Sequence, residues 1–192
     1  MNHLNRRTFL AGASSSLLTF GSGLALAHND AGRVEPPQAV PEVELTLDDD
    51  KAAKLSALLS GRVTALQLMF TSCQATCPIQ GALFAEAAKK LGDKVKGAQL
   101  LSISIDPEHD SPAELRGWLD KFGRSPLWRA ARPKKEQLQA LVEALKSKKP
   151  GPDPHTAQAY YFDRKGQLVM RSVDFPAASD IARMLEQLAA KK

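Results

Sequence analysis

The chain contains two cysteines, Cys73 and Cys77, which are separated by three residues and followed directly by Pro78. The apolar run Leu66 to Phe70 precedes them and has the length and composition of a buried strand. Proline is favourable at the first position of a helix, so we expect Cys73 to Cys77 to form a loop, with a helix starting near Pro78. Because a helix N-terminus stabilises an anion, at least one thiol should have a lowered pKa. This arrangement indicates either a redox pair or a site for a soft metal ion.

Two less specific interpretations apply to the same pair of residues. Cysteines are often just small buried apolar side chains, and two near neighbours can form a static disulfide. The order of strand, Cys-x-x-x-Cys-Pro and helix favours chemistry over both interpretations. The spacing is one residue longer than in the Cys-x-x-Cys redox motif, which leaves more room for a metal ion.

A histidine could complete a metal site, and the chain has four. His3 lies in an N-terminal targeting segment, and we expect His28 to be solvated rather than part of a copper chelate. His109 lies in a turn and is expected to be a solvated loop residue. A lone loop histidine is more often a surface residue than a ligand. His155 ends the proline-rich loop 149–155 and precedes a predicted strand, and this stiff approach makes it the best candidate for a ligand among the four. Two thiolates and one imidazole suit Cu(I), and can hold Cu(II) with a further donor, whereas structural zinc sites use four protein ligands.

Residues 1–27 have the pattern of a twin-arginine export signal. The sequence Asn5-Arg6-Arg7-Thr8-Phe9-Leu10 is followed by a modestly apolar stretch, and Ala25-Leu26-Ala27 fits a cleavage site. Serines and glycines interrupt the apolar stretch, which disfavours a membrane anchor. We therefore predict a periplasmic protein without a stable anchor. The periplasm is oxidising, so the two cysteines should form a disulfide, bind a metal, or be kept reduced by a partner.

The charge pattern excludes one class of partner. The formal net charge is +5, but the basic residues are dispersed and do not form an arginine-rich or aromatic-interleaved patch. We therefore expect no nucleic-acid binding. A solvated basic surface of this kind would suit an acidic protein partner.

The rest of the sequence predicts a flexible linker and one domain. Residues 28–42 are rich in proline, alanine and charge and are predicted to be the linker, and residues 43–192 form the domain. Hydrophobic periodicity predicts strands near 43–47, 66–70, 98–105, 127–131, 157–162 and 168–173, and helices near 79–91, 112–122, 138–145 and 181–188. Alternating strands and helices predict parallel pairing around the cysteines. The expected class is α/β: a thioredoxin-like fold with a central mixed sheet flanked by helices, plus an N-terminal extension.

One helix has a clear start signal and a predicted core face. Ser111 is placed to cap it, with Pro112 at the first position and Glu114 completing a capping box. Trp118 lies on the apolar face of this helix and should belong to the core rather than to a functional site.

Three segments carry a resemblance to a known family. They are Phe70-Thr-Ser-Cys73-x-x-x-Cys77-Pro78, then Ser102-Ile-Ser-Ile-Asp106-Pro107-Glu108-x-Asp110-Ser-Pro112, and the late His155 before Tyr160-Tyr-Phe-Asp163-x-x-Gly166. Together, over residues 43 to 190, they resemble the Sco/SenC family of copper chaperones. The resemblance implies a thioredoxin-like fold, copper bound by Cys73, Cys77 and His155, and a role in maturing the copper centre of cytochrome c oxidase.

Three functions stay open at this point. The favoured one is a metallochaperone that binds Cu(I), Cu(II) or both through Cys73, Cys77 and His155. It would deliver copper to a client such as a cytochrome c oxidase subunit, with a copper donor or thiol reductant as a second partner. The alternative is an enzyme, a thiol-disulfide oxidoreductase in which Cys73 and Cys77 reduce the client's copper-ligand cysteines. A peroxidase of the peroxiredoxin kind is disfavoured. Its usual Pro-x-x-x-Thr-x-x-Cys pattern needs a Thr or Ser three residues before the cysteine, and Phe70 stands there.

Overall fold

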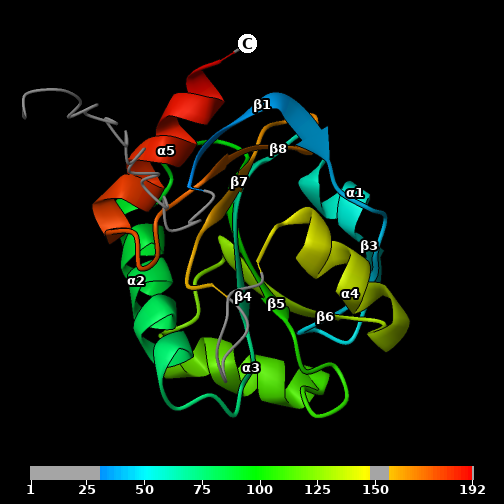
Figure 1. Ribbon diagram of the computed structural model, residues 1–192. Helices are drawn as coiled ribbons and strands as arrows, with labels where there is room; N and C mark the ends of the chain where they lie inside the picture. The colour runs from blue at the N-terminus through cyan, green and yellow to red at the C-terminus, as the bar shows by residue number, and fades with distance from the viewer. Residues whose placement is uncertain (1–30, 148–155, 192) are drawn as a thin grey trace, which may run out of the picture.

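The computed structural model describes residues 31–147 and 156–191 (Figure 1). Within these ranges, eight strands form one mixed sheet in the order β1-β8-β7-β4-β5-β6-β2-β3. The strands are β1 (Gly32–Ala39), β2 (Glu44–Leu47), β3 (Ala52–Lys54), β4 (Val63–Met69), β5 (Ala98–Ser104), β6 (Trp128–Pro133), β7 (Tyr160–Phe162) and β8 (Gln167–Arg171). The helices are α1 (Leu55–Leu59), α2 (Thr76–Leu91), α3 (Pro112–Lys121), α4 (Lys135–Ala144) and α5 (Ala178–Ala190). None of the helices in the described ranges is long and apolar enough to span a membrane.

The centre of the sheet consists of the parallel strands β4, β5 and β6. Strand β4 pairs with β5 along its whole length, from Val63 opposite Ala98 to Met69 opposite Ser104. Every residue of these two strands is buried, as expected for strands that are covered on both faces. The predicted parallel pair and the α/β class are confirmed. Their carboxyl ends, where β4 leads into the cysteine loop, therefore lie side by side.

Helices cover both faces of the sheet (Figure 1). Helices α2, α3 and α5 pack on one face, where they share an apolar cluster with alternate residues of β4 and β5. Helices α1 and α4 pack on the other face over the remaining residues of these strands. Trp118 is 1% exposed, so its predicted place in the core is confirmed. The capping box of α3 is also confirmed, because the Ser111 side chain accepts from the backbone of Glu114 and the Glu114 side chain accepts from the backbone of Ser111.

The N-terminal extension differs from the prediction. The linker assignment is wrong for residues 32–39, which form the edge strand β1, antiparallel to β8. Val34 is buried and anchors this strand on the core. Prolines 36 and 37 cannot donate to a ladder, and the register of β1 shifts between Arg33 and Gln38, which an edge strand tolerates. The strand predicted near 43–47 is confirmed as β2, which forms a hairpin with β3 and also pairs with β6 of the main sheet.

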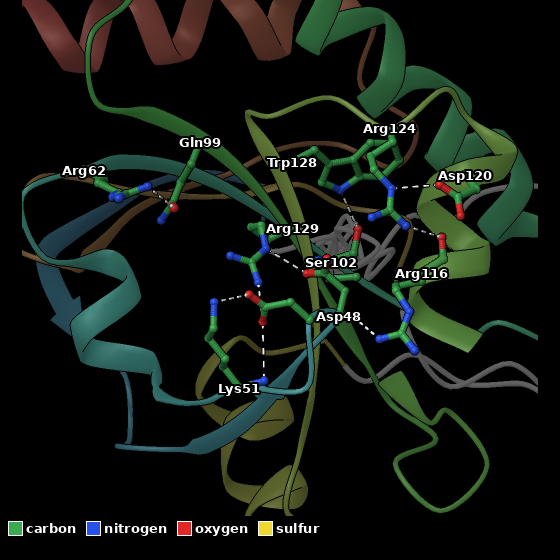
Figure 2. Close-up of polar contacts among 12 residues, drawn as sticks. Asp48, Lys51, Arg62, Gln99, Ser102, Arg116, Asp120, Arg124, Trp128 and Arg129 are labelled. Atoms are coloured by element: carbon green, nitrogen blue, oxygen red, sulfur yellow. Dashed lines mark hydrogen bonds and ion pairs between the residues drawn. The ribbon is translucent and has the colours of Figure 1, made fainter. Parts of the chain in front are cut away.

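Polar contacts fasten this hairpin to the domain. Figure 2 shows Asp48, after β2, beside Arg129 of β6. The Asp48 carboxylate accepts from Arg129 Nε at 2.8 Å, and Arg116 Nη1 of α3 donates to the Asp48 carbonyl at 2.7 Å. A buried carboxylate is stable only when it is paired, so this contact fixes the turn. In the adjacent core, Trp128 Nε1 donates to Ser102 Oγ at 2.9 Å (Figure 2).

Candidate metal and thiol site

The two cysteines lie where β4 passes into α2. Cys73 is half-buried in the loop after β4, and Cys77 is buried in the first turn of α2. The helix begins at Thr76, two residues before Pro78, so the predicted start near Pro78 is confirmed, while the predicted loop is shorter and ends at Ala75. Pro78 occupies the third helical position, where a backbone N–H has no partner within the helix, so its lack of an N–H is tolerated. The steric preference of a residue before proline for extended backbone does not prevent Cys77 from being helical.

The Cys73 sulfur serves as the cap of this helix. No side chain caps α2 from Ala75, the N-cap residue. The backbone N–H of Cys77 instead points at Cys73 Sγ at 3.4 Å, and Thr76 Oγ1 lies 3.8 Å from the same sulfur. An acceptor at a helix N-terminus is stabilised most when it carries negative charge. The loop therefore holds the Cys73 sulfur where a thiolate is favoured.

The two thiols have opposite electrostatic environments. Burial favours the neutral form of Cys73, but donation from the Cys77 thiol and from the backbone of Cys77 and Ala75 outweighs it, so the pKa of Cys73 is lowered. Burial, with the thiol's donation to Cys73, raises the pKa of Cys77 to about 12. The expectation of at least one lowered thiol pKa is met by Cys73. The pair is thus one accessible, acidic thiol and one buried, weakly acidic thiol.

A buried carboxylate that was not predicted as part of the site holds the cysteine loop in place. Asp110 is 1% exposed and accepts from Thr71 Oγ1 at 2.5 Å and from Thr71 N at 3.1 Å. Its other hydroxyl donor is Ser104 Oγ, at 2.6 Å, at the end of β5. The sequence suggested only a helix start at this position. Hydroxyl residues at the ends of two adjacent parallel strands were the available signal that a shared acceptor lies between them.

His109 lies in the turn before Asp110 and behaves as predicted. Its side chain is 79% exposed, and its Nδ1 atom lies 2.8 Å from Asp106 Oδ1, which raises its pKa. Within residues 31–147 and 156–191, no three His, Cys, Asp or Glu side chains are close enough together to hold a metal ion. The described cysteines therefore supply two soft ligands, and a third protein ligand would have to come from elsewhere in the chain.

His155, the predicted third ligand, lies outside the described residues, as do the predicted export signal, His3 and His28. The residues that follow His155 are described, and they are bonded to the cysteine helix. Gln80 of α2 donates from Nε2 to the carbonyl of Gln158 at 3.0 Å. Gln80 is buried, and its Oε1 atom has no hydrogen-bond partner among the described residues. Only residues 160–162 of the predicted strand 157–162 form β7, because the preceding residues bond to Gln80 and to the chain after β8.

A thiol pair at the junction of a central strand and the following helix, in a mixed sheet with helices on both faces, defines a thioredoxin-like dithiol protein. The sequence model of the SCO1/SenC family matches residues 34–190. The chain belongs to this family, so the predicted resemblance is confirmed.

Individual relatives agree with this assignment. The chain is 34% identical to the SCO1 protein homolog of Bacillus subtilis (strain 168) over 68 residues, which are 35% of each protein, so the match spans about a third of that relative. The structure of Bradyrhizobium japonicum ScoI with copper bound has a TM-score of 0.65 at 23% identity, and covers 78% of this chain and 99% of ScoI. A second solved structure is that of BsSco, which is described with a disulfide switch and as a member of the Sco family of cytochrome c oxidase assembly proteins. It has a TM-score of 0.70 at 20% identity, and the match covers 82% of this chain and 96% of BsSco. At these identities the structural likeness establishes the thioredoxin-like fold.

Proposed function

We propose that this chain is an exported copper metallochaperone. In this proposal, Cys73, Cys77 and His155 bind copper and pass it by ligand exchange to a client such as the copper centre of cytochrome c oxidase. One observation carries the proposal. The two cysteine sulfurs and the segment that follows His155 lie at the same end of α2. Family membership supports it, since copper is bound in the ScoI structure and BsSco is described among oxidase assembly proteins.

Chain connectivity supports His155 as the third ligand. Gln80 follows Cys77 by three residues and so lies on the same side of α2. Its bond to Gln158 fixes a point of the chain that is three residues from His155. Three residues span at most about 11 Å, which lets an imidazole at position 155 reach the first turn of α2. On the other side of this segment, Thr156 Oγ1 lies 2.6 Å from Tyr160 OH, so the anchor begins one residue after His155.

The donor set fits copper by its chemistry. Two thiolates and an imidazole are soft to borderline ligands, which Cu(I) prefers. Cys77 has a raised pKa, so copper must displace its proton. Copper affinity should therefore increase with pH as the cost of removing that proton falls. Oxidation of the pair to a disulfide would consume both thiolates, and the oxidised protein should bind no Cu(I).

The deciding experiment is the His155→Ala variant of the full chain in its reduced form. Copper affinity is measured by competition with a Cu(I) chelator and by Cu(II) absorption, with thiol titration alongside. We expect copper binding to collapse while both thiols remain titratable and the Cys73–Cys77 disulfide still forms. His109→Ala is the matched control, because it removes an exposed histidine that the proposal leaves unused. Unchanged affinity and spectrum in His155→Ala, or an equal loss in His109→Ala, would refute the three-ligand site.

Thiol-disulfide exchange is the second candidate function, and the asymmetry of the thiols favours it. The accessible Cys73, with its lowered pKa, is suited to attack a disulfide, and the buried Cys77 is suited to resolve the mixed disulfide. This activity needs no histidine. If His155→Ala retains full copper affinity and the reduced protein also reduces a client disulfide, the oxidoreductase becomes the preferred function.

A further inference from the structure

Three large apolar side chains are exposed in the described part of the chain. Ile79 is 55% exposed, Val173 60% and Phe175 39%. Ile79 follows Cys77 by two residues on α2, and the other two lie between β8 and α5. Exposed apolar residues scattered singly need no explanation, but residues gathered beside a reactive site indicate a contact surface.

Hydrogen bonds place these residues around one short segment, 157–159. Gln80, next to Ile79, donates to the carbonyl of Gln158 at 3.0 Å. From the other side, the Phe175 N–H donates to the carbonyl of Ala157 at 3.0 Å. The Gln158 side chain also donates to the carbonyl of Ser172, directly before Val173, at 2.6 Å. The segments that carry the apolar residues, the first turns of α2 and the chain after β8, therefore border residues 157–159 from two sides.

The backbone holds Phe175 in this exposed position. Its φ is +51°, in the left-handed region that a bulky non-glycine residue seldom adopts. The Phe175 N–H bond to Ala157, and the Asp174 carboxylate that accepts from Ala157 N at 2.9 Å, keep the turn in this shape. Strained backbone of this kind is found where surrounding contacts impose it, and it clusters at functional sites.

The two segments that carry Ile79, Val173 and Phe175 contain almost no charge. Residues 63–85, which include the whole cysteine loop, contain no charged residue. Residues 172–179 contain one, Asp174, and its carboxylate is occupied by the Ala157 N–H. The charged side chains nearest the cysteine loop belong to the turn before α3, where Asp106, Glu108 and His109 are at least partly exposed and Asp110 bonds to Thr71. These two segments can bury apolar side chains of a partner without desolvating ions.

We propose that Ile79, Val173 and Phe175 form a docking rim for the client, and that the client docks through an uncharged, apolar segment that flanks its cysteine pair. This inference rests on the proposed function, because it assumes that Cys73 and Cys77 exchange with the thiols of a client. It adds the chemistry of the client segment, which the thiols alone do not determine.

A peptide disulfide serves as the probe of the rim, because thiol exchange brings client and protein into contact at Cys73. The Cys73 thiolate attacks one sulfur of the peptide disulfide, which forms a mixed disulfide and releases one peptide thiolate. The Cys77 thiol then loses its proton to solvent and attacks Cys73 Sγ, which releases the second peptide thiolate. The protein ends as the Cys73–Cys77 disulfide, and two electrons have passed to the peptide, whose thiolates take up protons from water.

The test compares two synthetic disulfide peptides with the reduced full-length protein. Both peptides contain the same disulfide loop; one is flanked by leucine and valine and the other by glutamate and aspartate. We expect at least about tenfold faster reduction of the apolar peptide, the factor that corresponds to about 1.4 kcal/mol. The Ile79→Ser/Val173→Ser variant should lose most of this preference. Phe175→Asn should lose part of it, because asparagine tolerates the positive φ while it removes the ring.

Two controls separate docking from thiol reactivity and from folding. Lys89→Ser, an exposed change in the last turn of α2, should leave both peptide rates unchanged. The rate with a small aromatic disulfide, 5,5′-dithiobis(2-nitrobenzoic acid), should be the same for all variants.

Three results would overturn the proposal: equal rates for the two peptides, equal losses with the small disulfide, or a dimer that the Ile79→Ser/Val173→Ser variant dissociates. The assay contains no copper, so a failure of the His155 site leaves it unaffected. Conversely, if the protein shows no preference between the two peptides, the copper measurements and the proposed function are unaffected.

Discussion

The opposed thiol environments predict a strict order of alkylation in the reduced, copper-free protein. The pKa of Cys77 is raised from 9.0 to about 12, so below pH 9 its thiolate population is about a thousandfold smaller than that of an ordinary cysteine. A thiolate of higher pKa is intrinsically more nucleophilic, which restores part of the rate. With a Brønsted coefficient of about 0.4–0.5, the net suppression is about 30- to 60-fold. Complete burial of Cys77 slows it further, and the lowered pKa of Cys73 speeds the other thiol.

The assay is limited alkylation with iodoacetamide over about pH 6 to 10, with mass spectrometry of the two modified positions. Cys73 should be modified first at every pH, by a factor of at least about 30 up to about pH 8 and by a smaller factor above it, where its thiolate population stops rising. In Cys73→Ser, the pKa of Cys77 should fall, because the neighbouring thiol no longer raises it. It should stay above 9.0, because burial is the largest cause of the shift. Equal modification of the two thiols in the parent, or a Cys77 pKa at or below 9.0 in Cys73→Ser, would refute the reasoning.

Two further substitutions test the scaffold of the site. Asp110→Asn keeps the volume but loses the carboxylate that accepts three hydrogen bonds at the cysteine loop, so urea denaturation should show a loss of about 2–4 kcal/mol; exposed Asp93→Asn is the control, and an equal loss there would contradict the role. Gly81→Ala should destabilise by about 1–3 kcal/mol, because its new Cβ would lie 2.6 Å from ring atoms of Phe122. Gly117→Ala is the control, because no heavy atom lies within 4 Å of the new Cβ, and it should stabilise the protein by up to about 1 kcal/mol. If both substitutions raise the free energy of unfolding, the Phe122 ring moves aside and the steric argument is wrong.

Local sequence rules were sufficient for the parts of the fold that depend on neighbouring residues. The buried strand before Cys73 and the capping box from Ser111 to Glu114 both follow from patterns within a few residues, and both are confirmed. The position of the thiols at a strand–helix junction follows from the same kind of pattern. The family resemblance then extended this local reading to the whole domain, and the match over residues 34–190 confirms it.

Local rules failed where a residue distant in sequence supplies the interaction. Residues 32–39 resembled a linker, because nothing in their own sequence reveals β8 as a partner. Nothing near Gly81 in the sequence reveals that the ring of Phe122, at the end of α3, leaves no room for a Cβ there.

The sequence by itself determined which atoms could do chemistry: two sulfurs, three residues apart, at the end of a buried strand. Tertiary structure alone decided how they differ. The pKa of Cys77 rises because core side chains bury it, and the pKa of Cys73 falls because the N-terminus of α2 donates to it. Asp110 became part of the site only because parallel strands bring Thr71 and Ser104 to one edge of the sheet. Solvation and hydrogen bonding act through space, so their outcome is set by the packing of segments that the sequence keeps apart.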